Sequence, residues 1–307
     1  MRFVRGVLNL PDSLRGAVVT LGSFDGLHRG HAALLDATQA MARRLDRKAM
    51  MLTFEPLPRE FLRDDPPARL TNVRERWRLL EHRALDAVLV LRFDAALRNL
   101  DGAQFIRMLR ERLGVAGIVI GHDFRFGRGG SADAAALVAA GAADGFEVEV
   151  VPPVLVGSER ASSSAIRAAL ASGDFPQAER LLGRPYTMRG RVVGGRKLGR
   201  TLGFPTANIR LRRRRIPLGG IFAVRVAGAD AGLRPGVASL GTRPTVDGVE
   251  PLLETYLFDF AGDLYGRELE VEFVAHLRNE ERFDSIDALV MQMQADARAA
   301  RAVLGLD

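Results

Sequence analysis

Two histidines stand close together in the segment 22–31, which reads GSFDGLHRGH. The apolar run 17–21 precedes this segment, so His28 and His31 are predicted to lie on a turn that leads from a strand into a helix. The N-terminus of a helix carries free N–H groups and partial positive charge, which suit phosphate, and glycines let a ligand approach the backbone closely. The segment therefore predicts a nucleotide site that meets phosphate charge with imidazole and amide groups.

Zinc binding is one alternative for the two histidines. The chain contains no cysteine, and no third histidine lies near the pair in the sequence, so a zinc ligand set is incomplete. The phosphate-binding loop pattern G-x-x-x-x-G-K-[ST] is also absent, so phosphate would be bound without a loop lysine. Ordinary surface histidines are the other alternative, which the glycines and the preceding strand disfavour.

A second candidate for phosphate binding is the segment 160–167, which reads RASSSAIR and opens a helical stretch. Serine hydroxyls at the start of a helix cap its free N–H groups. The same hydroxyls can hold phosphate oxygens, with Arg160 and Arg167 supplying positive charge. From the residues alone, capping and phosphate binding are both open, and the presence of the histidine segment favours phosphate.

The segment 194–208, GGRKLGRTLGFPTAN, is rich in glycine and basic residues and ends at the start of a strand. Backbone amides of such a loop can surround a diphosphate. Thr206 and Asn208 offer a hydroxyl and an amide oxygen, which are hard ligands suited to magnesium. A basic surface hairpin is the alternative. Further along, Glu254 lies in the strand-like run 252–258 and is a candidate general base, although such a residue taken alone is more often a solvated strand residue.

The chain is basic, with a formal net charge of +7. Such a balance fits nucleic acid, an anionic membrane surface or polyanionic substrates, so charge alone decides little. The densest basic cluster comprises Arg210 and residues 212–215. No aromatic residues interleave with it, so a stacking surface for single strands has little support. We predict that this cluster is a solvated loop.

Length and composition favour a cytoplasmic enzyme of two domains. With 307 residues and 47% hydrophobic content, the chain can fill two ordinary cores. No apolar stretch approaches the length of a membrane span, and the first apolar run is too short for a signal peptide. The absence of cysteine excludes disulfides and thiolate metal sites.

The first part of the chain alternates strand and helix signals, which indicates a parallel sheet covered by helices on both faces. The expected strands are 17–21, 48–54, 86–91, 116–120 and 147–151, and the expected helices are 31–44, 73–83 and 104–113. Asp101 and Gln104 are predicted to form a capping box for the last of these helices. Ligands of such sheets bind beyond the carboxyl ends of the strands, where the histidine segment lies.

The pattern changes near residues 184–186. Beyond this point, short runs separated by glycine and proline predict a small antiparallel barrel, with strands at 186–193, 220–226, 236–240, 252–258 and 268–275. A closing helix from about Ser285 is predicted to dock on the barrel through one apolar face, formed by Ile286, Leu289, Val290, Met293 and Ala297. We therefore expect an α/β chain with two domains, 1–184 and 185–307.

These motifs resemble those of a known family. The segment 22–31 resembles the HxGH signature of nucleotidylyltransferases, and in its extended form that of bacterial FAD synthetases, the bifunctional riboflavin kinase/FMN adenylyltransferases. The run GRTLGFPTAN resembles the signature of riboflavin kinases, and RASSSAIR is similar to the family pattern R-x-S-S-T-x-x-R, with Ser164 in place of threonine. The resemblance covers nearly the whole chain in the family's order. It implies a Rossmann-like nucleotidylyltransferase domain followed by a riboflavin kinase barrel.

The resemblance also implies roles for the matched residues. His28 and His31 would stabilise the reacting phosphoryl group in the adenylyltransferase, and Glu254 would be the catalytic base of the kinase. The implied ATP contacts of the adenylyltransferase are Gly22, Phe24, Asp25, Gly30, Asp123, Arg160, Ser163, Ser164 and Arg167. Its implied flavin contacts are Phe54, Pro56 and Pro58, in a loop where Leu57 replaces a frequent histidine. In the kinase, Gly194, Lys197, Gly199, Gly203 and Pro205 would bind ATP, Thr206 and Asn208 the metal, and Arg278, Glu281 and Phe283 the flavin.

The implied function is that of a bifunctional FAD synthetase. Such an enzyme phosphorylates riboflavin to FMN with ATP and Mg²⁺, then adenylylates FMN to FAD and releases pyrophosphate, with neither nucleic acid nor a membrane as partner. Two alternatives stay open. One is a riboflavin kinase whose first domain is inactive or uses another acceptor, and the other is a basic RNA-binding barrel.

Overall fold

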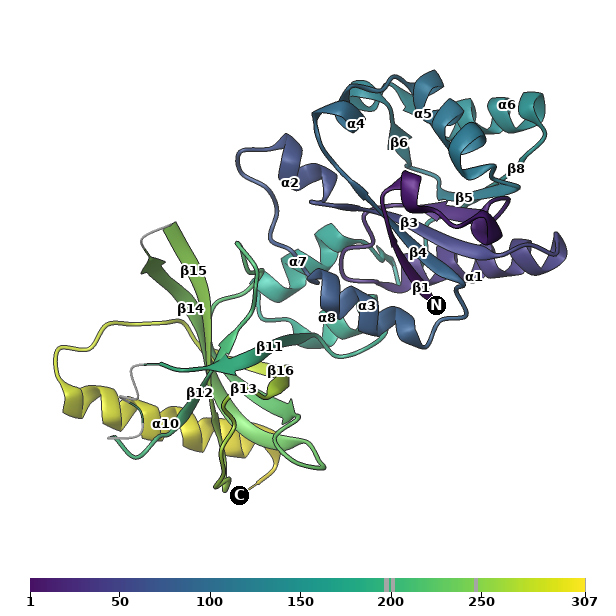
Figure 1. The fold of residues 1–307 in the computed structure, drawn as a ribbon. Helices are drawn as coiled ribbons and strands as arrows, with labels where there is room; N and C mark the ends of the chain where they lie inside the picture. Colours follow the sequence, from purple (N-terminus) through teal and green to yellow (C-terminus); the bar gives the residue numbers. More distant parts are fainter. Residues whose placement is uncertain (196–198, 200–201, 246–247, 307) are drawn as a thin grey trace. The chain divides into compact units, whose positions relative to one another are not determined.

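Contacts divide the chain into two compact units in the computed structural model (Figure 1). The structure describes residues 1–195, 199, 202–245 and 248–306. One unit comprises Met1–Pro67 and Arg76–Ala161, and the other comprises Ala68–Glu75 and Ser162–Asp307. This division differs from the expected boundary at residue 184, because the short segment Ala68–Glu75 and the residues from Ser162 onward group with the barrel. The assignment of 1–184 and 185–307 to separate activities stays a prediction.

The first unit is built on a six-stranded sheet, and all of its pairings are parallel, which confirms the expected fold class. The edge strand β1 was absent from the predicted strands, because its sequence RFVR is half charged and only Val4 in it is buried. In spatial order, the strands are β1 (Arg2–Arg5), β4 (Ala87–Arg92), β3 (Ala49–Glu55), β2 (Val18–Leu21), β5 (Gly117–Gly121) and β8 (Glu147–Val151).

Both faces of this sheet are buried, which explains why its inner strands are continuous apolar runs rather than alternating ones. Successive residues of one strand belong to different apolar clusters. Val18 and Met51 lie in one cluster, and their neighbours Val19 and Met50 lie in the other. The helices along this part of the chain are α1 (Arg29–Arg44), α2 (Pro58–Leu62), α3 (Val73–Glu81), α4 (Ala95–Asn99), α5 (Gly102–Met108) and α6 (Ala134–Asp144), with a π-helical turn at Leu109–Leu113. Short strands also pair, β6 (Arg125–Phe126) with β7 (Ala132–Asp133) and β9 (Leu155–Val156) with β10 (Glu159–Arg160).

Helix starts follow the local capping chemistry. The Asp101 carboxylate accepts a hydrogen bond from the Gln104 amide at 2.8 Å, and the Gln104 side chain accepts one from the Asp101 amide at 2.9 Å, so the predicted capping box is confirmed. Helix α1 begins at Arg29, two residues before the expected start, because His28 occupies its N-cap position.

The second unit is a closed barrel of six antiparallel strands, as the glycine-punctuated runs predict. Helices α7 (Ser163–Ala171) and α8 (Phe175–Leu182) precede it in the chain, and Phe175 of α8 packs edge-on against Phe222 of the barrel, with 5.9 Å between the ring centroids. Around the barrel, the strands are β11 (Thr187–Val193), β12 (Thr206–Arg210), β15 (Gly248–Leu257), β14 (Arg234–Thr245), β13 (Gly220–Ala227) and β16 (Glu268–Arg278).

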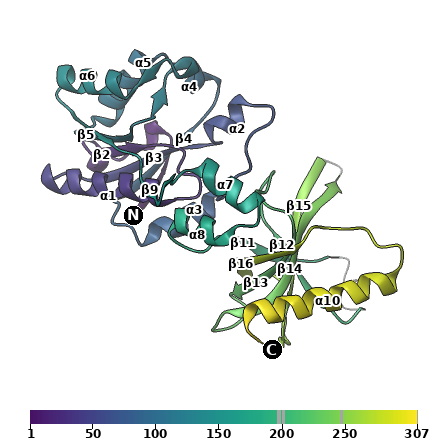
Figure 2. The same ribbon diagram turned by 180° about the vertical axis from the view of Figure 1, so that it is seen from behind.

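Helix α10 (Ile286–Leu304) lies along the barrel, where it packs against β13, β14 and β16 (Figure 2). Its N-cap is Ser285, which agrees with the predicted start. The predicted docking face is wrong at Ile286, which is 62% exposed, because the first residues of the helix lie outside the contact with the barrel. Asp296, a residue outside the predicted face, is buried instead.

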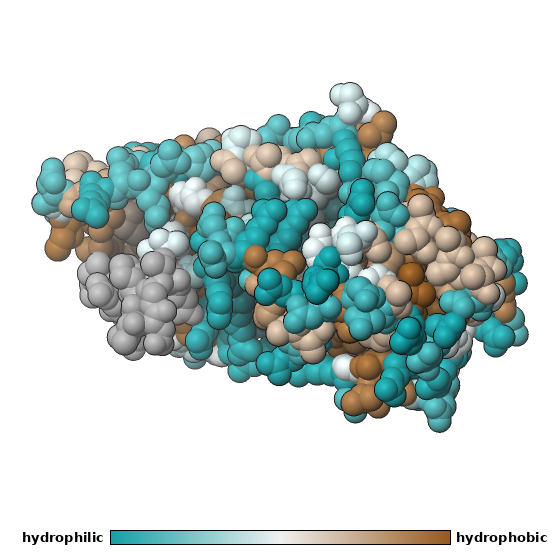
Figure 3. Space-filling model, turned by 90° about the horizontal axis from the view of Figure 1, so that it is seen from above, coloured by the Kyte–Doolittle hydropathy of each residue, from teal (hydrophilic) through white to brown (hydrophobic). Residues whose placement is uncertain are grey.

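Hydrophilic residues interrupt the apolar patches on the face drawn in Figure 3. Across the residues that the structure describes, no helix combines the length and the apolar character needed to cross a membrane.

The basic loop after β12 departs from the predicted solvated cluster at one residue. Arg212, Arg214 and Arg215 are exposed, but the Arg213 side chain is fully buried. Arg213 donates hydrogen bonds to Glu75, to the Leu70 carbonyl at 3.0 Å and to the Tyr186 hydroxyl at 3.0 Å.

The charge of Arg213 is compensated inside its own unit. Burial by itself would lower the pKa of Arg213, but Glu75 and Tyr186 raise that pKa above the ordinary arginine value. Glu75 also accepts a hydrogen bond from the Arg189 amide of β11 at 2.8 Å. The prediction failed at Arg213 because its carboxylate partner lies far upstream in the sequence, in the segment Ala68–Glu75 that groups with the barrel.

We predict that Glu75→Gln strongly destabilises the barrel unit, since it keeps the shape of the side chain but leaves the Arg213 charge buried and unpaired. Breaking one side of a buried ion pair typically costs about 3–5 kcal/mol. Urea unfolding followed by hydrogen exchange in peptides from β11 and β13 measures the loss. The control Glu147→Gln breaks an exposed pair with Arg44 and should have little effect. Equal losses in the two variants would contradict the role of burial.

Candidate active sites

The two histidines of the segment 22–31 stand at the start of α1, directly beyond the end of β2. The imidazoles of His28 and His31 stack with 3.6 Å between their centroids, and the His31 amide donates to Nδ1 of His28 at 3.3 Å. Because Nδ1 is the acceptor, the neutral His28 ring carries its proton on Nε2. The predicted strand-to-helix turn is thus present, and it presents an imidazole N–H together with the amides of a helix N-terminus.

The backbone of this turn is held in an unusual conformation. Phe24 and Leu27 have φ values of 48° and 43°, in the left-handed region that residues other than glycine rarely adopt. Each such residue costs on the order of 1–3 kcal/mol and persists only where its surroundings hold it. The ring of Phe24 is fully buried and lies 5.1 Å from that of His31, which is one such constraint.

Gly30 fills the narrow space beside His28. A Cβ at this position would stand 3.1 Å from the His28 ring and 3.1 Å from the Ala161 carbonyl oxygen. Of the other residues expected here, Asp25 is buried, and Gly22 lies so close to Phe24 that a Cβ would meet its ring at 3.2 Å. The turn therefore depends on glycine for close approach rather than for flexibility alone.

Two residues predicted from separate motifs meet beside the sheet. Arg160 of β10 donates to Asp123, which follows β5, at 2.7 Å. Partial burial would raise the pKa of Asp123, but the ion pair with Arg160 outweighs it and holds that pKa below the ordinary aspartate value. Asp123 is therefore ionised at neutral pH. Phe126, three residues after Asp123, is buried in the core of the unit.

The rest of the RASSSAIR motif belongs to the second unit, at the start of α7. Ser162 is the N-cap and accepts a hydrogen bond from the Ala165 amide at 3.2 Å, so one serine does cap the helix. Ser163 and Ser164 form the first turn of α7, and Arg167 donates to the Ala68 carbonyl of the same unit.

The loop expected to bind flavin follows β3. Phe54 is buried and packs edge-on against Phe93, with 5.8 Å between centroids, while Pro56 and Pro58 are partly exposed. Phe93 in turn packs against the exposed Phe61 of α2 at 5.6 Å. The sequence reasoning missed Phe61 and Phe93, since neither lies in a motif. A search for aromatic residues at strand ends would have found Phe93, which follows β4.

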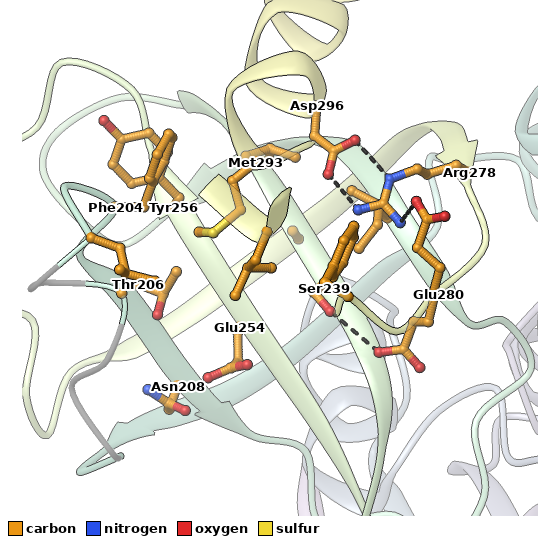
Figure 4. A pocket seen from close by; sticks show the side chains of 18 residues that line it. Phe204, Thr206, Asn208, Ser239, Glu254, Tyr256, Arg278, Glu280, Met293 and Asp296 are labelled. Carbon is orange, nitrogen blue, oxygen red and sulfur yellow. Dashed lines mark hydrogen bonds and ion pairs between the residues drawn. The ribbon is translucent and has the colours of Figure 1, made fainter. Parts of the chain in front are cut away.

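The barrel unit contains a cavity of about 400 Å³. Its lining residues come from strands β12 to β16, from the loop before β12, from the segment after β16 and from α10. Figure 4 shows Thr206, Asn208 and Glu254 gathered at one end and the pair Arg278 and Asp296 at the other. Seven of the predicted site residues line it: Gly199, Thr206, Asn208, Glu254, Arg278, Glu281 and Phe283.

Strand register places the polar end of this cavity. Asn208 of β12 and Ser239 of β14 both pair with Glu254 of the intervening strand β15, and Thr206 pairs with Tyr256 two residues along. Because side chains alternate between the faces of a strand, Thr206, Asn208 and Glu254 all point to the same side of the barrel wall. The motif 194–208 and Glu254, far apart in the sequence, are thereby brought together.

A second cavity, of about 330 Å³, lies on the other side of Thr206 and Asn208. These two residues line both cavities. The rest of its lining comes from the segment 260–265, which contains Phe260 and Tyr265, and from Val192, Gly195, Pro205, Ala207, Thr255 and Leu257. The sequence reasoning missed this second cavity, since no motif considered above includes the segment 260–265.

Two glycines of the glycine-rich loop lie in close contact with other residues of the segment 194–208. A Cβ at Gly199 would stand 2.2 Å from the Phe204 carbonyl oxygen, and one at Gly195 would stand 2.5 Å from the Asn208 amide. Gly203 has a φ of +82°, which favours glycine, whereas Gly194 has open space beside it. Lys197, expected to bind ATP, lies outside the described residues.

Arg278 organises the opposite end of the first cavity. Its Nε and Nη2 donate to the two carboxylate oxygens of Asp296 at 2.8 and 2.7 Å, and its Nη1 lies 3.1 Å from Glu281. The hydrogen bonds to Asp296 raise the pKa of Arg278 above its ordinary value. The guanidinium also stands over the Phe283 ring, 5.8 Å from its centroid. Sequence reasoning found Arg278, Glu281 and Phe283 but missed Asp296, which no motif marks.

Metal binding by several acidic or histidine ligands has no support in the described part of the chain, where no group of three or more such residues is placed to hold an ion. The oxygens of Thr206 and Asn208 are hard donors. They suit Mg²⁺, which commonly takes few protein ligands and completes its shell with water and substrate phosphates.

Comparisons with known proteins identify a family for each part of the chain. A family model described as FAD synthetase matches residues 10–165, and one described as riboflavin kinase matches residues 182–304. A relative from Escherichia coli strain K12 is 45% identical over 100% of this chain and 99% of its own length, and one from Pseudomonas fluorescens is 46% identical over 99% and 98%. Both relatives are named bifunctional riboflavin kinase/FMN adenylyltransferase.

A solved structure from Streptococcus pneumoniae, described as a macrolide-efflux protein, is 31% identical, with a TM-score of 0.82. The match covers 98% of this chain and 99% of that one. Its description names transport, whereas both family models and both relatives name enzymes.

We predict that Gly30→Ala displaces the His28 ring, because the added Cβ would crowd both the imidazole and the Ala161 carbonyl. The ring should then lose the hydrogen bond from the His31 amide. NMR of protein labelled with ¹⁵N-histidine detects this as a shift of the Nδ1 signal of His28. The control Gly232→Ala makes the same change where no atom lies within 4 Å, and it should leave the spectrum unaltered. An unchanged His28 signal in Gly30→Ala would contradict the tight fit.

Proposed function

The chain belongs to the family of bifunctional riboflavin kinase/FMN adenylyltransferases, and we propose that it converts riboflavin to FMN and then FMN to FAD, using ATP in both steps. The proposed kinase site lies in the barrel unit. The proposed adenylyltransferase chemistry is centred on the histidine turn of the first unit.

The observation that carries the kinase proposal is the pair of cavities that meet at Thr206 and Asn208. Phosphoryl transfer needs a donor and an acceptor held in line, with charge stabilisation between them. The first cavity, with its apolar walls, suits the flavin ring, and the second suits the nucleotide. Glu254 lines the first cavity close to their junction, where the hydroxyl to be phosphorylated would lie (Figure 4).

In the proposed kinase reaction, Glu254 accepts the proton of the ribityl 5′-hydroxyl as that oxygen attacks the γ-phosphorus of ATP. The bond from the γ-phosphorus to the β–γ bridging oxygen breaks, and ADP leaves. Thr206 and Asn208 would hold Mg²⁺, which supplies charge neutralisation on the phosphates when bound. Arg278, Glu281 and Phe283 close the flavin end of the cavity, while Gly194, Lys197, Gly199, Gly203 and Pro205 form the proposed phosphate loop.

In the proposed second reaction, a phosphate oxygen of FMN attacks the α-phosphorus of ATP, and pyrophosphate leaves. The phosphate of FMN is already a nucleophile, so no covalent enzyme intermediate is needed. The Nε2–H of His28, with His31 beside it, would donate to the α-phosphoryl oxygens as their charge grows in the transition state.

The other predicted residues of this reaction follow from the family resemblance. Gly22, Phe24, Asp25, Gly30 and Asp123 would contact the nucleotide, and Phe54, Pro56 and Pro58 the flavin. Positive charge from Arg160 and Arg167, with the hydroxyls of Ser163 and Ser164, would bind the β- and γ-phosphates. One assay tests the whole proposal: protein, riboflavin and MgATP should yield FMN first and FAD later, separated by chromatography.

We predict that Glu254→Gln lowers FMN production from riboflavin by about 10²–10⁴-fold, the usual effect of losing a positioned base. FAD synthesis from supplied FMN should be retained, since it takes place at the other site. The control Glu179→Gln changes an exposed residue of α8 and should affect neither reaction. Near-normal kinase turnover in Glu254→Gln would exclude this residue as the base.

Replacing both His28 and His31 with alanine should have the opposite selectivity. FAD formation from FMN should fall by at least about 10²-fold, the typical loss for one transition-state donor, while FMN formation from riboflavin persists. The exposed His82→Ala in the same unit serves as the control. If kinase activity dropped equally in a folded double variant, the assignment of two separate sites would be wrong.

A further inference from the structure

The proposed reactions leave one buried cation of the first unit without a role. Arg76 lies in α3, and its side chain is only 5% exposed. Burying a guanidinium is costly unless its charge and its N–H groups are satisfied. The groups that satisfy Arg76 are therefore informative, because they must be held where the guanidinium needs them.

Arg76 donates hydrogen bonds to residues of two different segments. Its Nη1 donates to the Ser23 carbonyl at 3.0 Å and to the Thr53 hydroxyl at 3.2 Å, and its Nη2 donates to Glu55 Oε2 at 2.8 Å. The Thr53 hydroxyl also donates to the Ser23 carbonyl at 3.3 Å. Ser23, Thr53 and Glu55 are thus tied together through one planar group.

The two segments are those on which the proposed adenylylation depends. Ser23 immediately precedes the strained residue Phe24 and lies on the turn that leads to His28. Thr53 and Glu55 flank Phe54 at the end of β3, next to Pro56 of the proposed flavin loop. A guanidinium has its N–H groups in a rigid fork, so it fixes the separation of its acceptors more tightly than a flexible ammonium does.

We propose that Arg76 is a positioning residue for adenylylation, holding the flavin loop against the histidine turn so that the FMN phosphate meets the α-phosphorus of ATP in line. The inference rests on the proposed function of the first unit. Arg76 itself touches neither substrate in this account. Reacting atoms must come within about 3–3.5 Å with correct alignment, and a misplacement of about 1 Å can cost about 10²-fold in rate.

The main test compares Arg76→Met with Arg76→Lys, and measures kcat and KM for FMN and ATP in adenylylation. Arg76→Met should lower kcat by about 10²-fold and raise the KM for FMN more than that for ATP. Arg76→Lys keeps the charge beside Glu55 and should recover a substantial part of the activity. Riboflavin kinase activity of the same preparation should stay unchanged in both variants.

The control is Arg74→Met, which removes an exposed arginine from the same helix and should leave every constant unchanged. Glu55→Gln and the double variant Arg76→Met/Glu55→Gln form a cycle with the main test. If Arg76 and Glu55 act through their ion pair, the double variant should lose no more adenylylation activity than Arg76→Met alone. If Arg76→Met does not fold, Arg76→Lys and Glu55→Gln still test the inference. In both variants the KM for FMN should rise more than the KM for ATP.

Three outcomes would overturn the inference. The first is that Arg76→Met has the same kcat and KM values for adenylylation as the control Arg74→Met. The second is an equal loss of kinase and adenylylation activity, which would indicate a general effect on folding. The third is a wild-type protein that makes FMN but no FAD, which would overturn the proposed function of the first unit and the role of Arg76 with it.

Discussion

The pairing register of β12, β15 and β14 is the constraint on which the barrel site depends. Asn208 and Ser239 flank Glu254 because backbone hydrogen bonds align the three strands at those residues. A shift of one residue would turn Glu254 away from the cavity and bring Thr255 into its place. The same register sets Thr206 and Asn208 in the wall between the two cavities. Closure of the barrel leaves no free strand edge along which the register could slip.

In the first unit, the corresponding constraint is the burial of both faces of a parallel sheet. Helices cover the faces, so a ligand can reach the backbone mainly at the ends of the strands. The turn after β2 lies at such an end, and it holds two residues in the left-handed region, Phe24 and Leu27. Burial of the Phe24 ring and the hydrogen bond from Arg76 to Ser23 oppose relaxation of that turn.

Three arginines with carboxylate partners recur at structurally important points. Arg76 pairs with Glu55, Arg213 with Glu75 and Arg278 with Asp296. In a chain with an excess of basic residues, Arg76 and Arg213 resemble ordinary surface charges in the sequence. Burial reverses that interpretation, because a buried guanidinium requires fixed acceptors and in turn fixes them. The failed prediction of a solvated loop at Arg213 and the missed Asp296 have this common origin.

The sequence by itself determined the fold class, the family resemblance and the approximate positions of the main strands and helices. Continuous apolar runs and helical spacing depend on local burial, and the glycine-rich motifs act through their own backbones, so both can be recognised from neighbouring residues. Only the tertiary structure decided which distant residues meet. It placed Glu254 beside Asn208, joined Asp123 to Arg160 and grouped the segment Ala68–Glu75 with the barrel. These contacts join residues far apart along the chain, and the side chains that form them carry no periodic signal that would reveal their partners.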